Sequence, residues 1–269
     1  MTFYSRMAVT QYTVYTEKWE KEQALRIVLL ADLHSRYYAE GQDKLARLIL
    51  DQKADLIALS GDIIDDQIPT QGAFELIKKI EGSAPIFYVT GNHECERDDL
   101  DDILTELKKY SIKVLDDKEA VFVFKGQKIR IAGLEDPCNR DCKMTKKDWI
   151  LEKKNLFHKQ EDTVSILISH RPELFYLYDR WGFDLVLCGH THGGFLRIPG
   201  LLNGLWAADQ GYFPKYAGGL YFHEGKAGNY AQVVSRGCAV NPIVPRIFNP
   251  PEIVVIDIKN KKLKNTELL

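Results

Sequence analysis

The sequence has no run of hydrophobic residues that approaches the roughly eighteen needed to cross a bilayer. Its first residues also lack the basic stretch followed by an apolar core that marks a signal peptide. We therefore expect neither a transmembrane helix nor a signal peptide. The expected location is the cytoplasm, and a peripheral contact with a membrane is left open.

The chain also lacks a large excess of either charge, since 36 Lys and Arg balance 38 Asp and Glu to a formal net charge of −2. This balance argues against a protein whose main function is to bind the backbone of nucleic acid, although it does not exclude a local basic patch. The 269 residues, of which 45% are hydrophobic, suffice for one large core and are few for two. We expect a single domain over residues 1–269.

Cysteine is scarce, and its five positions are odd in number and widely spread. Such a set indicates reduced thiols in the cytosol rather than a framework of disulfides. Cys138 and Cys142 are close enough for a metal or redox pair, but no second pair accompanies them. We expect free thiols in a loop at these two positions.

What the sequence does contain is a pattern of apolar runs that end in metal-binding residue types. The run at 184–188 leads into Gly189-His190-Thr191-His192, which two further glycines follow. Alternate side chains of an extended segment share a face, so the two imidazoles can point the same way. Taken alone, this stretch is equally compatible with a surface loop that carries two histidines.

The same arrangement recurs four times upstream, and five of the seven histidines lie in these places. Ligands of open α/β sheets bind beyond the carboxyl ends of the strands, so five strands that end in this way can converge on one site. A scattering of structural histidines would not give this distribution. The runs at 27–31, 55–59, 85–89 and 164–168 lead respectively into Asp32 and His34, Asp62, Asn92 and His93, and His170.

Periodicity and turn residues predict an α/β protein. Short β-type runs in the middle of the chain form a meander, which implies a second or mixed sheet rather than a plain Rossmann order. We expect a leading edge strand within 1–20 and a long loop rich in Gly and aromatic residues over 195–230. Helices are predicted over 42–53, 70–80, 98–110, 146–157 and 173–181, and further strands over 113–115, 120–124, 128–132, 230–235 and 252–258.

The candidate metal ligands offer oxygen and nitrogen donors without a thiolate, a set suited to Mn²⁺, Fe²⁺/Fe³⁺ or Zn²⁺. Seven ligands are too many for one ion and suit two ions that share a carboxylate. Two ions about 3.5–4 Å apart lower the pKa of a bridging water and hold both oxygens of an in-line displacement at phosphorus. The seven are Asp32, His34, Asp62, Asn92, His170, His190 and His192.

In their order along the chain, these motifs resemble the calcineurin-like metallophosphoesterase superfamily. They are Asp32-x-His34, Gly61-Asp62-x-x-Asp65, Gly91-Asn92-His93-Glu94, a lone His170 and Gly189-His190-Thr191-His192. Later segments, including Ser235-Arg236-Gly237 and residues 245–252, further resemble the bacterial YkuE/YaeI-like phosphodiesterase branch. The resemblance implies a four-layer sandwich, in which helices flank two mixed β-sheets.

The resemblance also implies a role for each residue. One metal ion would be bound by Asp32, His34 and His192, the other by Asn92, His170 and His190, with Asp62 bridging both. His93 would protonate the leaving oxygen as general acid, and Asp65 would orient His93. A carboxylate bonded to an imidazole fixes its tautomer and raises its pKa, as this role requires.

These assignments predict a phosphodiesterase that attacks phosphorus in line with a metal-bridging hydroxide, on a small-molecule or lipid-linked phosphoester. The alternatives are a phosphomonoesterase or a nucleotide-sugar-lipid pyrophosphatase on the same site, or a non-catalytic metal-binding scaffold. Asp66 stands where the protein Ser/Thr phosphatases of the superfamily have Arg, which argues against a protein substrate. Phe195 stands where the branch often has Gln, so contacts at the rim of the site are expected to differ.

Several residues outside the motifs have a structural and a functional interpretation. We expect Arg171 and Arg236 to form structural ion pairs, with contact to a substrate phosphate as the alternative, and His158 and His223 to be ordinary polar positions. The apolar residues of the long loop are expected to form a small core of their own, with an apolar rim for a lipid-bearing or aromatic substrate as the alternative. They are Phe195, Leu201, Leu202, Leu205, Trp206, Tyr212, Phe213 and Tyr216.

Overall fold

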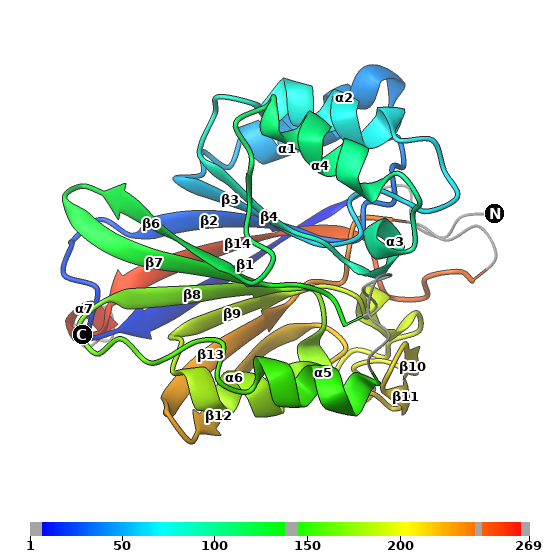
Figure 1. The fold of residues 1–269 in the computed structure, drawn as a ribbon. Helices are drawn as coiled ribbons and strands as arrows, with labels where there is room; N and C mark the ends of the chain where they lie inside the picture. The colour runs from blue at the N-terminus through cyan, green and yellow to red at the C-terminus, as the bar shows by residue number, and fades with distance from the viewer. Residues whose placement is uncertain (1–6, 138–144, 240–243, 265–269) are drawn as a thin grey trace.

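Two six-stranded β-sheets lie face to face, and helices cover the outer face of each (Figure 1). The computed structural model describes residues 7–137, 145–239 and 244–264. In order across the first sheet, the strands are β1 (Ala8–Thr16), β14 (Glu252–Asn260), β2 (Leu25–Leu30), β3 (Leu56–Ser60), β4 (Ile86–Val89) and β5 (Lys113–Val114). Across the second they are β12 (Gly219–Gly225), β13 (Gly228–Val234), β9 (Leu185–Cys188), β8 (Val164–Ser169), β7 (Gln127–Leu134) and β6 (Lys118–Phe124).

The helices divide between the two outer faces (Figure 1). The first sheet is covered by α1 (Asp43–Leu50), α2 (Gln71–Ile80) and α4 (Leu100–Lys108), and the second by α5 (Lys146–Lys153) and α6 (Phe175–Trp181). The described residues also form two short helices, α3 (Asn92–Cys95) and α7 (Lys261–Lys264), and a small hairpin of β10 (Trp206–Ala207) and β11 (Gly211–Tyr212). Short 3-10 helices lie at η1 (Glu40–Gln42), η2 (Pro172–Leu174) and η3 (His192–Gly194).

Both sheets are mixed, and their parallel strands bring the loops of the sequence motifs to one end of the sandwich. In the first sheet β2, β3, β4 and β5 are parallel, whereas β14 runs antiparallel to β2. In the second sheet β7, β8, β9 and β13 are parallel, with β6 and β12 antiparallel at the two edges. The predicted α/β sandwich of two mixed sheets flanked by helices is confirmed.

The central strands are buried on both faces, which is why they read as continuous apolar runs rather than as alternating ones. In β2, Ile27 and Leu29 pack between the sheets against β8 and β9, while Val28 and Leu30 pack against the helices. This double burial fixes the register of each strand, because a slip by one residue would exchange the two sets of side chains. The residue that follows each strand is thereby placed at the site described below.

The predicted helices and strands all occur, with ends that differ by a few residues. The turn between β6 and β7 has two residues with positive φ, Lys125 at 48° and Gly126 at 79°, as a tight hairpin requires. The expectation of a loop throughout 195–230 is wrong for β12, whose Leu220-Tyr221-Phe222-His223 pairs with β13 as a hairpin edge. Its glycines and aromatic residues predicted a loop because this edge strand is only partly buried, with Leu220 and Tyr221 packed against the two cores.

No helix of the described residues is long and apolar enough to cross a membrane. Cys95, Cys188 and Cys238 are buried thiols without a disulfide. Cys138 and Cys142 lie outside the described residues.

Candidate metal centre

The seven predicted ligands and His93 lie together where the two sheets meet. Asp32 and His34 follow β2, Asp62 follows β3, and Asn92 and His93 are the first residues of α3 after β4. From the second sheet, His170 follows β8, and His190 and His192 follow β9. The loops are joined directly, since the backbone N–H of His190 donates to Asp32 Oδ1 over 3.0 Å. The convergence expected from the strand ends is therefore present in the structure.

Five of these ligands have a left-handed backbone, with φ between 49° and 72°: Asp32, His34, Asp62, His190 and His192. This conformation costs about 1–2 kcal/mol for a residue with a side chain. Such strain persists where the surrounding structure imposes it, and it gathers at functional sites.

Two glycines let the loops approach this closely. A Cβ on Gly61, whose φ is +81°, would lie 2.4 Å from His170 Nδ1, and one on Gly91 would lie 2.2 Å from Asp62 Oδ1. Any side chain at either position would displace a predicted ligand.

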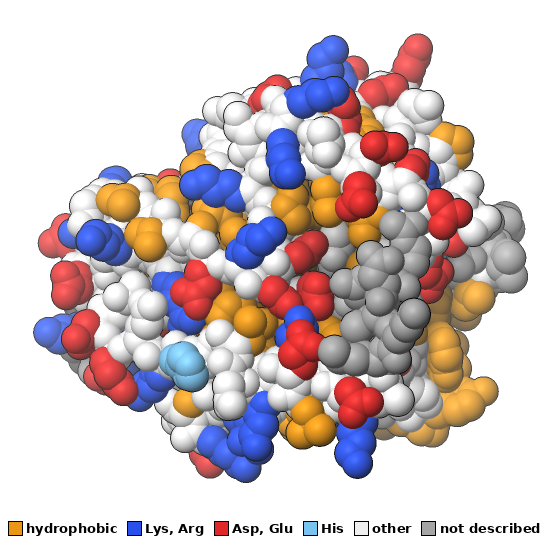
Figure 2. Space-filling model, viewed as in Figure 1, with side chains coloured by type: hydrophobic (Ala, Val, Ile, Leu, Met, Phe, Trp, Pro, Cys, Tyr) orange, Lys and Arg blue, Asp and Glu red, His pale blue; other side chains and the backbone are white. Residues whose placement is uncertain are grey.

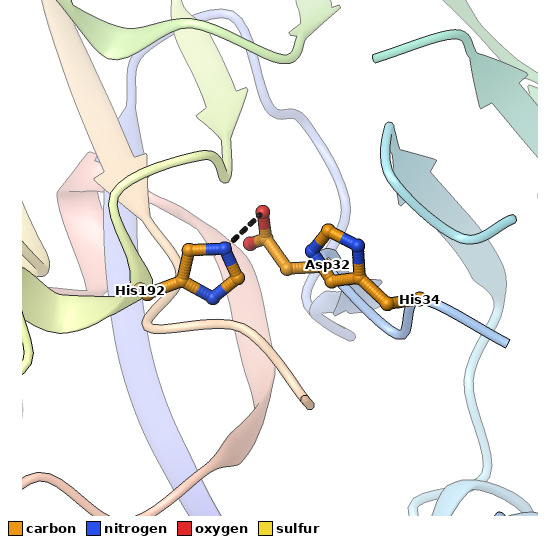
Figure 3. A group of neighbouring side chains, drawn as sticks. All are labelled: Asp32, His34 and His192. Carbon is orange, nitrogen blue, oxygen red and sulfur yellow. Dashed lines mark ion pairs between the residues drawn. The ribbon is translucent and has the colours of Figure 1, made fainter. Parts of the chain in front are cut away.

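The first cluster of ligand atoms comprises Asp32, His34 and His192 (Figure 3). Asp32 Oδ1 lies 3.9 Å from His192 Nε2, and the rings of His34 and His192 stack with centroids 5.2 Å apart. His34 Nδ1 bonds to Asp65 Oδ2 over 3.0 Å; because a carboxylate only accepts, the proton is on Nδ1. His34 Nε2 is then left with a lone pair, and it is buried with no hydrogen-bond partner among the described residues.

The imidazole of His192 is suited to bind a metal ion because it is held neutral. Burial lowers the pKa of His192 well below its ordinary value, and the nearby His34 and Arg246 lower it further. A metal ligand of this type must be unprotonated.

The second cluster comprises Asp62, His170 and His190. His170 Nδ1 donates to Ser60 O over 2.8 Å, and His190 Nε2 donates to Asp209 Oδ2 over 3.0 Å. The other ring nitrogens, His170 Nε2 and His190 Nδ1, lie 3.1 Å apart, and His170 Nε2 lies 3.1 Å from Asp62 Oδ2. His170 Nε2, His190 Nδ1 and Asp62 Oδ2 each carry a lone pair, and at this spacing they require a proton or a metal cation between them.

The negative charge around His170 also favours a positive charge at this position. Burial lowers the pKa of His170, but Asp62 and Asp32 outweigh burial and raise it to about 10. Asn92 supplies a further oxygen, because its Oδ1 is buried and lacks a hydrogen-bond partner within the described part of the chain. The donor set therefore fits a second metal ion.

Asp62 connects the two clusters. Its Oδ2 lies 3.1 Å from His170 Nε2 in the second cluster and 3.8 Å from His34 Nε2 in the first. The same oxygen lies 4.0 Å from His93 Nε2. One fully buried carboxylate thus faces both groups of ligands, the arrangement that a bridging ligand requires.

The structure corrects the predicted partner of His93. His93 Nδ1 bonds to Asp66 Oδ1 over 2.5 Å, whereas Asp65 Oδ2 is 3.8 Å from that nitrogen and bonds to His34 instead. Burial alone would lower the pKa of His93, but Asp62, Asp66 and Asp65 together raise it. Consecutive residues of one turn point to different imidazoles, which spacing in the sequence does not reveal.

Glu94 holds two motif loops together, a role that the sequence analysis did not assign. Its Oε2 accepts the N–H groups of Asp62 and Gly91, and its Oε1 accepts the N–H of Ile64 and the hydroxyl of Tyr88, at 2.7–2.8 Å. The side chain is fully buried. The carboxylate therefore fixes the backbone that carries Asp62.

Replacing Glu94 by alanine should destabilise the fold as well as the site. Glu94→Ala leaves three buried N–H groups without an acceptor, and we expect the free energy of unfolding to fall by about 3 kcal/mol. Urea unfolding followed by circular dichroism measures this loss. Glu94→Gln is the matched control, because it keeps one oxygen and should lose less. An Ala variant as stable as the wild type would contradict this role.

Asp209 is a second residue that sequence analysis missed, and no motif surrounds it. It lies in the long loop, yet its Oδ2 accepts the proton of His190 Nε2 and also pairs with Arg171. A carboxylate behind a ligating histidine fixes the tautomer and the orientation of the ring. Asp209 thereby leaves His190 Nδ1 free to face His170.

Loss of Asp209 should weaken one metal site and spare the other. We expect Asp209→Ala to lower the affinity of the second cluster by about 10- to 100-fold. Metal titration by isothermal calorimetry, with the content after dialysis measured by mass spectrometry, gives the result. Lys146→Ala is the control, because it removes the exposed 3.2 Å ion pair of Asp209 and keeps the bond to His190. Equal affinities in Asp209→Ala and wild type would contradict the positioning of His190.

The two candidate phosphate-binding arginines form ion pairs within the chain, as expected. Arg171 forms a two-pronged pair with Asp136 at 2.7 and 3.0 Å, and Arg236 pairs with Glu252. His223 lies away from the metal centre and stacks on Tyr230 with ring centroids 4.5 Å apart.

Comparison with known proteins indicates a family for the chain. A family model for calcineurin-like phosphoesterases matches residues 25–194. The chain is 32% identical over 246 residues to an uncharacterized metallophosphoesterase of Campylobacter jejuni, spanning 88% of this chain and 60% of that protein. It is 27% identical over 260 residues to an uncharacterized metallophosphoesterase of Aquifex aeolicus, spanning 95% and 93%. Phosphodiesterase YaeI of Escherichia coli is 31% identical over 183 residues, spanning 65% of this chain and 63% of that protein.

The chain belongs to the calcineurin-like phosphoesterase family. The family resemblance drawn from the motifs is thereby confirmed. The chain spans less than two thirds of the Campylobacter and Escherichia relatives.

Proposed function

We propose that the protein is a phosphodiesterase with two metal ions, Mn²⁺, Fe²⁺/Fe³⁺ or Zn²⁺. Asp32, His34 and His192 would bind one ion and Asn92, His170 and His190 the other, with Asp62 shared. The observation that carries the proposal is the position of Asp62 Oδ2, 3.1 Å from His170 Nε2 and 3.8 Å from His34 Nε2. When bound, two such ions generate a nucleophile at neutral pH and neutralise charge on the phosphoryl oxygens.

His93 would act as the general acid. Its side chain is 30% exposed, so that it reaches the mouth of the site, and Asp66 holds Nδ1. The proton on Nδ1 is engaged with Asp66, and Nε2 is the atom that would protonate the leaving oxygen. Asp66 would position His93, and Asp65 would position the ligand His34.

A diester suits the charge of the site better than a monoester does. A monoester dianion carries one more negative charge, for which additional cationic side chains are needed. Arg171 and Arg236 are both engaged with carboxylates, whereas Arg246, whose Nη2 lies 3.3 Å from His192 Nδ1, offers one positive charge to match the single negative charge of a diester. The name of the related YaeI, a phosphodiesterase, supports the same choice. The alternative of a phosphomonoesterase has no comparable observation in its favour, and a small-molecule or lipid-linked diester is the proposed substrate class.

The test compares bis-p-nitrophenyl phosphate with p-nitrophenyl phosphate as substrates. Chelator-stripped protein would be reconstituted with Mn²⁺, Zn²⁺ or Fe²⁺ and assayed with both. We expect hydrolysis only with metal, and a higher kcat/KM for the diester. A higher kcat/KM for the monoester would replace the proposal by a phosphatase. Inactivity with every metal would favour the non-catalytic scaffold.

A further inference from the structure

A group of large apolar side chains is exposed beside the metal centre. We call these residues the apolar rim: Leu201, Trp206, Tyr212, Phe213 and Phe248. Their exposed fractions run from 41% for Trp206 to 82% for Leu201. Figure 2 shows hydrophobic side chains gathered at the edge of the molecule where Figure 1 places β10 and β11. The expectation that the apolar residues of this loop form a small core of their own is therefore wrong for Leu201, Trp206, Tyr212 and Phe213, whereas Phe195, Leu202 and Leu205 are partly buried and Tyr216 is buried.

The apolar rim is continuous with the metal centre. Phe195 stacks on the predicted ligand His192 with ring centroids 5.8 Å apart, and Trp206 stacks on Phe195 at 6.0 Å. A row of rings thus leads from the first cluster of ligands to an exposed tryptophan.

Backbone hydrogen bonds hold the rim in place. Trp206 and Tyr212 face each other in the β10–β11 hairpin, and the N–H of Phe213 donates to Leu205 O over 2.8 Å. The N–H of Ile247 donates to Phe195 O over 3.0 Å, which fixes the segment of Phe248 against the loop. An ordered backbone therefore carries the apolar side chains, so binding does not have to order this segment at a further cost in conformational entropy. A preformed apolar patch of this kind marks a binding surface.

The charge around the rim suits an anion. Residues 195–218 include Arg197 and Lys215, and their one acidic residue is Asp209, which His190 and Arg171 engage. Next to Phe248, Arg246 places Nη2 3.3 Å from His192 Nδ1. Apolar side chains with cationic neighbours match an anionic amphiphile.

We propose that the apolar rim binds the long apolar chain of the substrate, so that the natural substrate is a lipid phosphodiester with its phosphate at the metal centre. The inference rests on the proposed function and names the class of substrate. The rings of Phe195 and Trp206 connect the rim to the predicted ligand His192, and this continuity favours the chain of a substrate over a protein partner or a second copy.

The only exposed tryptophan of the chain reports directly on the rim. Trp19, Trp149 and Trp181 are at most 1% exposed, so a change in the environment of tryptophan upon binding arises from Trp206. We would titrate the metal-loaded protein with decyl phosphonate and with methyl phosphonate, which contain no ester to hydrolyse. We expect decyl phosphonate to shift the emission to the blue and to bind at least about 10-fold more tightly, because each buried methylene favours binding.

Two variants and a control assign that signal. Trp206→Phe should abolish the blue shift, and Phe213→Ser should weaken the binding of decyl phosphonate. Phe222→Ser is the matched control, because Phe222 is as exposed as Phe213 but pairs with Ala231 on β13, toward the other end of the sheet. Equal affinities for the two phosphonates, or no emission shift, would overturn the inference. So would a dimer that Phe213→Ser dissociates, since the rim would then be an interface between copies.

A second assay separates this inference from the proposed function. Methyl, octyl and decyl p-nitrophenyl phosphate share a leaving group and differ in chain length. We expect kcat/KM to rise at least about 10-fold from the methyl to the decyl diester, and Phe213→Ser to reduce that ratio. Turnover of the methyl diester without a gain from longer chains would overturn the inference and leave the phosphodiesterase proposal intact. Inactivity toward every diester would contradict the phosphodiesterase proposal, and the inference with it.

Discussion

Replacing His93 by alanine is expected to lower kcat for diester hydrolysis by about 100- to 10,000-fold while both metal ions stay bound. His93 is no predicted ligand, and its Nε2 faces the site 4.0 Å from Asp62 Oδ2. The loss should be larger for a diester with a basic leaving group, such as diphenyl phosphate, than for bis-p-nitrophenyl phosphate. A nitrophenolate leaves without a proton, whereas a phenolate leaves faster when an acid supplies one. Equal losses for both leaving groups would contradict the role of general acid.

The two neighbouring aspartates provide a control for this result. Asp66→Ala should lower kcat with metal content unchanged, because Asp66 bonds to His93. Asp65→Ala should instead weaken metal binding, because Asp65 bonds to His34. If the two variants exchanged these properties, the pairing originally expected from the motif, Asp65 with His93, would be restored.

Replacing Asp62 by alanine is expected to lower the affinity for both metal ions by more than about 100-fold, since even residues behind a ligand contribute 10–100-fold. Its carboxylate lies between the clusters and is 98% buried, so no water or nearby side chain replaces it readily. Metal content after gel filtration, measured by mass spectrometry, gives the stoichiometry. Circular dichroism is the control for folding, and Asp62→Asn, which keeps one oxygen, should retain more metal than Asp62→Ala.

The outcome for Asp62 distinguishes a shared ligand from one that serves a single ion. Loss of only one ion would show that Asp62 belongs to one cluster. Retention of two tightly bound ions would contradict the assignment altogether.

The sequence was sufficient to predict that the seven candidate ligands lie together, because their positions follow from a topological rule. His170 and His190 are 20 residues apart in the chain, yet β8 and β9 are adjacent parallel strands, so the residues after them lie side by side. The same rule applies across the sandwich, where Asp62 from the first sheet meets His170 from the second. Buried parallel strands appear in the sequence as apolar runs, so the residue at which each strand ends can be identified from the sequence.

The partners of the ligands were less accessible to sequence analysis. Asp65 and Asp66 lie in one turn, and only its backbone conformation decides which carboxylate meets which imidazole. Asp209 reaches His190 from a loop without a periodic pattern. The rim was misjudged for a related reason: the hydrophobicity of Trp206 and Phe213 is evident in the sequence, but their burial depends on what packs over the loop.

The central claim is that two metal ions share Asp62, and anomalous scattering from a crystal loaded with Mn²⁺ tests it most directly. We expect two peaks about 3.5–4 Å apart on either side of the Asp62 carboxylate. Asp32, His34 and His192 should surround one peak, and Asn92, His170 and His190 the other. A single peak, or two peaks without Asp62 between them, would contradict it.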